Sequence, residues 1–140
     1  NDVPPVDLAT NARTMRALQA AIEAGAEGAC HDLSEGGLAV AAAEMAFGGG
    51  LGVELDLDGM VLRGEVPAAC RLFAEDAGRF LVEVAPEHYD AFLRAVQDVP
   101  VGELGRVTDS GRVQISHAGR AVVDVDAAEA KAAWQGTFAW

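Results

Sequence analysis

Positive charge is scarce in this sequence, and no long apolar run is present. Ten Lys and Arg residues stand against 22 Asp and Glu residues, which gives a formal net charge of -12. Binding to a phosphate backbone needs clustered basic side chains, and the ten here are scattered, so we expect no nucleic-acid partner. No apolar run approaches the roughly 18 residues that a membrane span requires, so we expect no membrane partner.

Cysteine is also rare, because Cys30 and Cys70 are the only two. Neither has the neighbour spacing of a metal site, and the three histidines share no ligand spacing either. Both cysteines lie in Ala-rich settings, which predicts buried thiols in a reducing cytoplasm. The nucleophile pattern G-x-S-x-G is absent as well. We therefore expect no metal site in this chain.

What remains is a chain of 140 residues, 51% of them hydrophobic, which is enough for one domain over residues 1–140. The N-terminus lacks a basic region followed by an apolar stretch, so it does not predict a signal peptide. The first methionine is Met15. Either processing or excision from a longer polypeptide accounts for this.

Hydrophobic periodicity predicts helices that alternate with strands. Helices are expected at about 8–24 (capped by Asp7), 38–47, 65–72, 86–96 and 127–134. Strands are expected at about 28–33, 53–57, 78–84, 101–107, 112–117 and 121–125. The last three strands have short turns between them, which predicts an antiparallel meander. The fold class is therefore α+β, an α/β sandwich in which helices pack on a mixed sheet.

The segment His31-Asp32-Leu33-Ser34-Glu35-Gly36-Gly37-Leu38 joins a strand to a helix start. Free N–H groups at a helix start can hold an anion, and Ser34 can cap the helix or donate to a phosphate. A capped helix whose glycines permit tight packing explains the pattern equally well. His31 and Asp32 point to opposite faces of a strand, so they do not form a simple dyad.

The second segment, Leu72-Phe73-Ala74-Glu75-Asp76-Ala77-Gly78-Arg79-Phe80, places two carboxylates before a glycine and an arginine. Glu75 and Asp76 could coordinate Mg²⁺, and Arg79 could bind a phosphate. Alternatively, Arg79 forms an ion pair with Glu75 or Asp76. Asp56 and Asp58 are interpreted as a solvated strand end.

Together these two segments resemble the last domain of PurL-type formylglycinamide ribonucleotide amidotransferases. The likeness rests on residues 31–40, on Ala43-Glu44-Met45-Ala46 and on residues 72–80, and it extends from about Pro5 to Trp134. Ala74 departs from the family pattern, where serine is usual, and this puts ligand binding at that position in doubt. The Ser34-Glu35 pair favours PurL over its superfamily relatives.

The resemblance implies a domain like the C-terminal domain of aminoimidazole ribonucleotide (AIR) synthase. It also implies a larger cytoplasmic enzyme that uses ATP, Mg²⁺ and glutamine-derived ammonia to form an amidine. Its partners would be the N-terminal domains of the same chain, with glutaminase and small accessory subunits. The catalytic histidine and most ATP ligands would lie outside this chain, which alone would be inactive and would bind no cofactor firmly.

On this basis the candidate phosphate or nucleotide contacts are His31, Asp32, Ser34, Glu35, Gly36 and Gly37. The candidates for a cleft between domains are Glu75, Asp76, Gly78 and Arg79. Two alternatives remain open. One is the C-terminal domain of another ATP-using relative, such as a hydrogenase-maturation protein, a selenophosphate synthetase or a thiamine-monophosphate kinase. The other is a non-catalytic structural or dimerisation module.

Overall fold

The computed structural model describes residues 6–26 and 28–136. Its helices are α1 (Leu8–Glu23), α2 (Gly37–Gly49), α3 (Ala68–Phe73), α4 (Tyr89–Ala95) and α5 (Ala127–Gly136), with 3-10 turns η1 (Leu57–Gly59) and η2 (Pro86–His88). Its strands are β1 (Ala29–Asp32), β2 (Gly52–Asp56), β3 (Phe80–Glu83), β4 (Gly105–Thr108), β5 (Arg112–His117) and β6 (Arg120–Asp126). The α+β class and the order of helices and strands agree with the sequence prediction.

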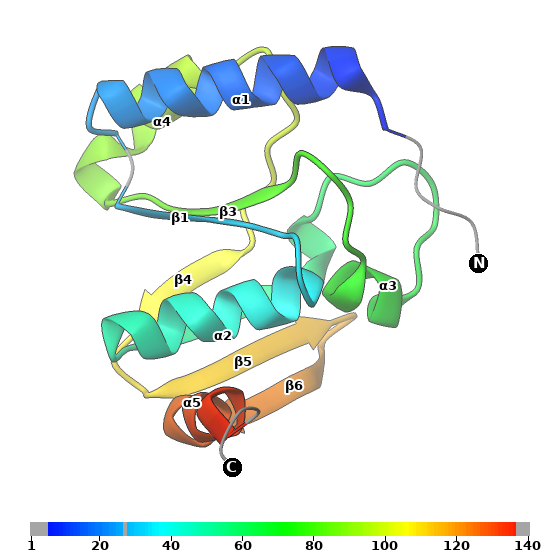
Figure 1. Ribbon diagram of the computed structural model, residues 1–140, viewed down its shortest axis with the longest axis vertical. Coiled ribbons are helices and arrows are strands. Elements are labelled where there is room, and N and C mark those ends of the chain that lie inside the picture. Colours follow the sequence, from blue (N-terminus) through cyan, green and yellow to red (C-terminus); the bar gives the residue numbers. More distant parts are fainter. Residues whose placement is uncertain (1–5, 27, 137–140) are drawn as a thin grey trace.

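The elements form layers around α2 (Figure 1). Helices α1 and α4 lie over a two-stranded sheet of β1 and β3, and α2 lies between this sheet and a four-stranded one. Leu38, Ala41, Ala42 and Ala46 of α2 are buried in the main core, together with side chains from β2, β5, α3 and α5. A helix covered on both sides needs apolar residues around most of its circumference, as its sequence predicts.

The four-stranded sheet has the order β4-β2-β5-β6. Strand β2 is antiparallel to β4 and parallel to β5, so the predicted meander of the last three strands is wrong at its first step. Strand β2 therefore lies between β4 and β5. The register explains this position, because Val53 and Leu55 of β2 lie beside Val113 and Ile115 of β5 and extend one apolar face. Only β5 and β6 form the expected antiparallel pair.

The other sheet is small, because β3 pairs only with β1 in the part of the chain that the structure describes. The predicted mixed sheet is the four-stranded one, but residues 78–84, which were predicted as a core strand, lie outside it because β3 pairs with β1. Strand β3 is half-buried, with Leu81 against the main core and Val82 against α1 and α4. The two faces of β3 therefore pack against different groups of side chains.

Helix α1 begins as predicted, with the Asp7 carboxylate accepting from Thr10 N at 3.0 Å. Its buried side is made of small residues, Ala17 and Ala21, which pack near α4 and β3. The cysteines differ from the prediction, since Cys30 and Cys70 are both exposed. Cys30 lies on β1 and Cys70 on the six-residue helix α3.

Helix α5 closes the described part of the chain. Asp126 caps its start, because Asp126 Oδ1 accepts from Ala128 N at 2.8 Å and from Glu129 N at 3.2 Å. Trp134 lies against Phe47 of α2, with ring centroids 5.8 Å apart. No helix within the described ranges is long and apolar enough to cross a membrane.

Candidate functional site

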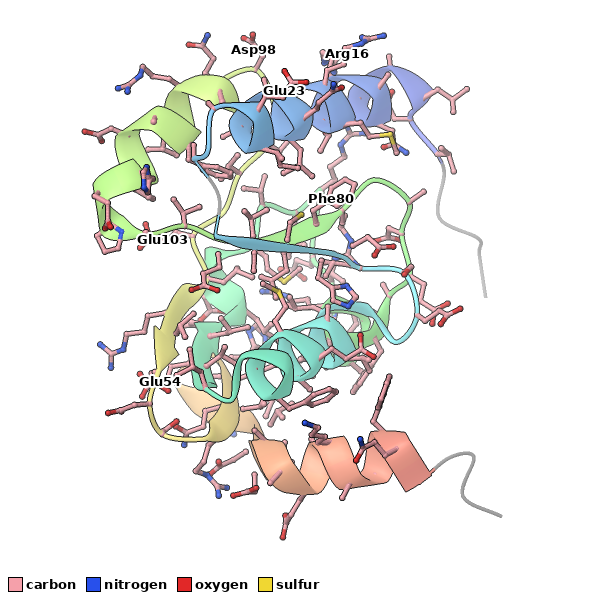
Figure 2. The ribbon with its side chains drawn as sticks, turned by 60° about the vertical axis from the view of Figure 1, so that its left-hand side comes forward. Arg16, Glu23, Glu54, Phe80, Asp98 and Glu103 are labelled. Carbon is pink, nitrogen blue, oxygen red and sulfur yellow. The ribbon has the colours of Figure 1, made fainter. Side chains whose placement is uncertain are left out.

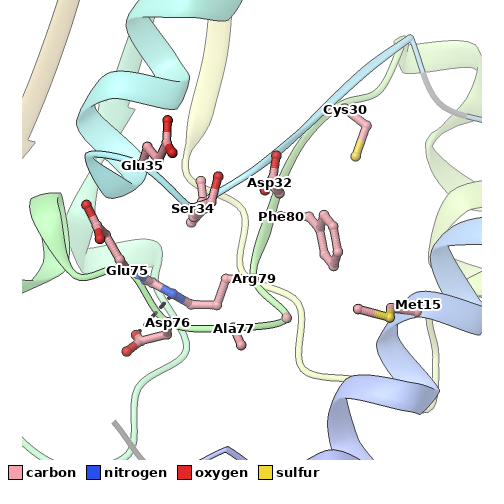
Figure 3. Close-up of a pocket in the computed structure, with 12 residues that line it drawn as sticks. Met15, Cys30, Asp32, Ser34, Glu35, Glu75, Asp76, Ala77, Arg79 and Phe80 are labelled. Carbon is pink, nitrogen blue, oxygen red and sulfur yellow. Dashed lines mark ion pairs between the residues drawn. The ribbon is translucent and has the colours of Figure 1, made fainter. Parts of the chain in front are cut away.

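The two sequence segments meet at one cavity of about 670 Å³ (Figure 3). The turn between β1 and α2 contributes Asp32, Ser34 and Glu35, and the loop between α3 and β3 contributes Glu75, Asp76, Gly78 and Arg79. We call this cavity the β1–α2 pocket. Seven of the ten predicted site residues line it.

A hydrogen bond connects the two segments directly. Gly36 N donates to Glu75 Oε1 at 2.9 Å. Gly36 occupies the N-cap position of α2 with a φ of 76°, and no side chain caps the helix, so the predicted Ser34 cap is wrong. The carboxylate of Glu75 therefore takes the place at the helix start that the phosphate hypothesis gave to a ligand.

Arg79 is held by its own loop. Its Nε lies 3.2 Å from Asp76 Oδ2, and one of its terminal nitrogens donates to Ala74 O at 2.5 Å. The contact with Asp76 is an ion pair without hydrogen-bond geometry, because the buried Nε has no hydrogen-bond partner among the described residues. Of the two ion pairs that the sequence left open, the structure forms the one with Asp76.

Asp32 faces the pocket as a stable anion. A hydrogen bond from the Ser34 hydroxyl is the main cause that lowers the pKa of Asp32, with help from a backbone N–H and the His31 ring. Four carboxylates and one guanidinium therefore surround the cavity. Such a site attracts cations and repels anions.

His31, Gly36 and Gly37 do not line the pocket. His31 pairs with Leu81 across the sheet and points toward α2, where its Nε2 lies 2.8 Å from Glu44 Oε2. Its Nδ1 lies 2.7 Å from Asp32 O. Asp32 O is a carbonyl oxygen and can only accept, so His31 Nδ1 is the donor in that contact.

The pocket also has an apolar part, which includes Met15, Cys30 and Phe80 and was not predicted from the sequence. Figure 2 shows Phe80 on the side of the two-stranded sheet that faces α1, whereas Arg16 and Glu23 point outward from that helix. Strand alternation places Cys30 and Asp32 on one face, and this was the signal available for Cys30. No sequence pattern pointed to Met15.

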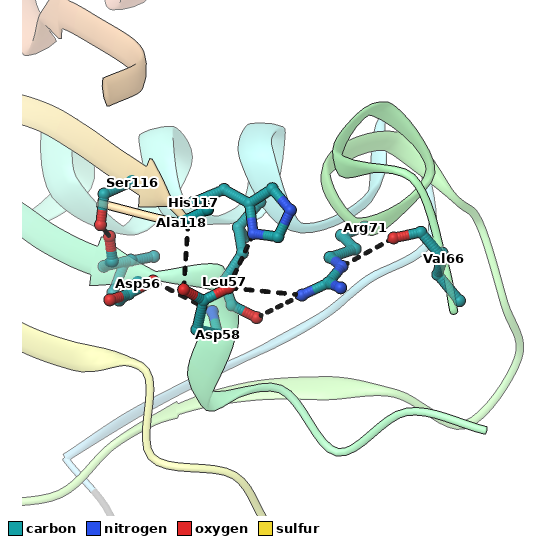
Figure 4. Close-up of polar contacts among 9 residues, drawn as sticks. Asp56, Leu57, Asp58, Val66, Arg71, Ser116, His117 and Ala118 are labelled. Carbon is teal, nitrogen blue, oxygen red and sulfur yellow. Dashed lines mark hydrogen bonds and ion pairs between the residues drawn. The ribbon is translucent and has the colours of Figure 1, made fainter. Parts of the chain in front are cut away.

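A second polar cluster, the Asp58 cluster, joins the four-stranded sheet to α3 (Figure 4). Asp58 accepts from His117 Nδ1 at 2.7 Å and from Ala118 N at 3.0 Å, and Arg71 lies 3.7 Å away. Arg71 also donates to Val66 O and Leu57 O. Asp58 is exposed, as its interpretation as a solvated strand end requires, but its carboxylate also accepts two hydrogen bonds that the sequence did not indicate.

The residues of the β1–α2 pocket do not fit a nucleotide or a resident metal ion. Its excess of carboxylates repels a polyphosphate. No group of three or more His, Cys, Asp or Glu side chains within 6–26 and 28–136 lies together as metal ligands would. The four carboxylates, the guanidinium and the apolar side chains of this arrangement suit binding and positioning.

Comparison with known proteins gives a family and a relative. The family model described as "AIR synthase related protein, C-terminal domain" matches residues 1–118. Phosphoribosylformylglycinamidine synthase subunit PurL of Carboxydothermus hydrogenoformans is 36% identical over 140 residues, which are 99% of this chain. The chain spans only 18% of the length of that relative.

Solved structures share the fold. Phosphoribosylformylglycinamidine synthase II of Thermotoga maritima matches 89% of this chain and 22% of its own, with a TM-score of 0.79 and 21% identity. The hydrogenase maturation protein HypE in complex with ATP matches 79% of this chain and 40% of its own, with a TM-score of 0.65 and 19% identity. These likenesses concern the fold, while the family match covers most of the sequence. The chain belongs to the family of AIR synthase related C-terminal domains.

Proposed function

We propose that this chain is the C-terminal domain of an ATP-dependent ligase of purine biosynthesis, of the phosphoribosylformylglycinamidine synthase type. The observation that carries the proposal is the 36% identity to a PurL subunit over the whole chain. The HypE likeness is weaker, at 19% identity. The Ser34-Glu35 pair in the first segment also favours PurL.

The domain acts as part of a larger cytoplasmic enzyme and is inactive alone. That enzyme converts formylglycinamide ribonucleotide, ATP and glutamine-derived ammonia to the amidine, ADP and phosphate. A T. maritima structure is named PurLQS, which supports accessory subunits as partners. Structures of T. maritima PurL with ATP and with ADP support nucleotide use by the whole enzyme, with Mg²⁺ as the companion of ATP.

The β1–α2 pocket serves this enzyme as a surface between domains rather than as its nucleotide site. Gly36 N–H already donates to Glu75, so an anion binds there only by displacing that carboxylate. Glu75 and Arg79 then fix the loop that carries them. The position of this loop matters for catalysis, because a misplacement of reacting groups by about 1 Å can lower the rate about a hundredfold.

A kinetic experiment tests this function. The polypeptide that contains this chain is purified, and amidine formation is measured with formylglycinamide ribonucleotide, ATP and ammonium. We expect activity in the unmodified protein and a loss of about tenfold or more in kcat/KM for Glu75→Ala with Arg79→Ala. The matched control is Glu54→Ala with Arg106→Ala, which removes a surface ion pair outside the pocket.

Three results would contradict the proposal, either as a whole or in its part about the pocket. A folded polypeptide that forms no amidine removes the ligase function. Full activity in the Glu75→Ala, Arg79→Ala variant would be consistent with the ligase function but would show that the pocket has no role in it. Equal losses in the pocket variant and the control would mean that the effect is one of general stability.

A further inference from the structure

A row of large apolar side chains lies exposed along α1. Leu8, Met15 and Ile22 are 76%, 54% and 46% exposed. Their seven-residue spacing places them on one side of the helix, beside the alanines that face the interior. Several large apolar side chains exposed along one side of a helix suit contact with another polypeptide.

This apolar row leads into the β1–α2 pocket. Met15 belongs to both, and inside the pocket it is joined by Cys30 and Phe80 (Figure 3). The pocket thus has an apolar side near α1 and a polar side formed by the two loops. A polypeptide that covers this apolar row would therefore also place side chains at the mouth of the pocket.

The polar rim of the pocket is strongly acidic. Asp32, Glu35, Glu75 and Asp76 contribute four carboxylates against the single guanidinium of Arg79. That guanidinium is already engaged by Asp76 and Ala74 O. An excess of three negative charges therefore faces whatever enters, and a Lys or Arg side chain is the polypeptide group that complements it.

On the basis of the ligase function proposed above, we propose that the pocket and the apolar row receive a basic segment of the same enzyme that lies outside this chain. A Lys or Arg side chain of that segment enters the acidic rim, and apolar side chains next to it cover Leu8, Met15 and Ile22. The relative's length supports this occupant, since this chain accounts for 18% of it. A second copy is disfavoured, because two chains of net charge -12 repel each other.

Oxidation of methionine by hydrogen peroxide, followed by mass spectrometry, tests this inference. The isolated 140-residue chain is compared with the longer polypeptide that contains it. We expect Met15 to oxidise severalfold more slowly in the longer polypeptide, because the segment covers it. Met45 and Met60 are partly buried within this domain and serve as internal controls.

The role of charge is tested within the longer polypeptide. Asp32→Asn with Glu35→Gln is expected to raise the oxidation rate of Met15 toward that of the isolated chain, as is high salt. Glu87→Gln with Glu129→Gln changes the net charge equally at exposed positions outside the pocket, and it is expected to leave Met15 protected.

Three outcomes would overturn the inference. Equal oxidation of Met15 in both proteins means that nothing covers the row. Protection that survives both charge neutralisation and high salt means that the segment is not basic. Protection that grows with the concentration of the isolated chain means that the occupant is a second copy. Amidine formation measured on the same samples separates this test from the ligase function, because an active enzyme with an unprotected Met15 refutes only the docked segment.

Discussion

Gly37 shows at the scale of one residue why the two segments of the pocket can meet. Its φ is +64°, and a Cβ atom there would lie 2.8 Å from Leu72 O and 2.9 Å from Ala74 O. The start of α2 therefore rests directly on the backbone at the end of α3. Any side chain at this position would push apart the two segments that form the pocket.

Gly37→Ala is expected to lower the free energy of unfolding by about 2–4 kcal/mol, from the unfavourable φ and the overpacking together. The control is Gly48→Ala in the same helix, where a Cβ meets nothing within 4 Å. There alanine is expected to stabilise by about 0.5 kcal/mol through helix propensity. Urea unfolding of both variants measures the difference. If Gly37→Ala is as stable as Gly48→Ala, the backbone of α2 does not approach the end of α3 as closely as described.

Contacts within one segment could be predicted from the sequence, and contacts between segments could not. The ion pair of Asp76 with Arg79 was one of two alternatives, because the residues are close in the chain. The bond from Gly36 to Glu75 spans 39 positions, and the contact of His31 with Glu44 depends on how β1 turns into α2. Spacing alone carries no information about such partners.

At the scale of elements, α2 joins the two sheets into one molecule. Leu38 is 1% exposed and belongs to the main core, whereas Leu8 of α1 is 76% exposed. Leu8 and Leu38 both lie in helices that hydrophobic periodicity predicted. Only the structure separates the leucine that packs from the leucine that does not.

Leu38→Ala is expected to lower the free energy of unfolding by about 3 kcal/mol, from lost apolar burial and the cavity that remains. Leu8→Ala is the matched control, and it is expected to change stability by less than about 0.5 kcal/mol. Chemical denaturation of both variants of the isolated chain measures the two values. A large loss for Leu8→Ala would show that α1 packs differently from the structure described here.

The type and order of the elements were predictable because hydrophobic period and turn residues act locally. Strand pairing was not, since the place of β2 between β4 and β5 depends on which apolar faces align in space. The short turn after β4 suggested a hairpin with β5, but β5 pairs with β2 instead, with Val113 beside Val53. The exposure of both cysteines has a similar origin, because burial depends on what covers an element.

At the scale of the whole molecule, the Asp58 cluster connects the four-stranded sheet to the α3 side of the pocket. The hydrogen bond from His117 is the main cause that lowers the pKa of Asp58, followed by the Ala118 N–H and the charges of His117 and Arg71. The ionised carboxylate is thus favoured by folding. This contribution to stability is present above the unfolded pKa, about 3.8, and is lost as the pH falls below it.

Asp58→Asn is therefore expected to lower the thermal midpoint at neutral pH, where the carboxylate contributes fully. The gap between the wild type and the variant should narrow as the pH falls below about 4, because protonated Asp58 resembles the amide. Asp109→Asn is the control, since Asp109 is exposed in the turn after β4 and its side chain has no hydrogen bond to a described residue. Thermal unfolding of the three proteins from pH 7 to pH 3 measures both gaps. A gap for Asp58→Asn that stays constant over this range would mean that the carboxylate's charge is not what joins α3 to the sheet.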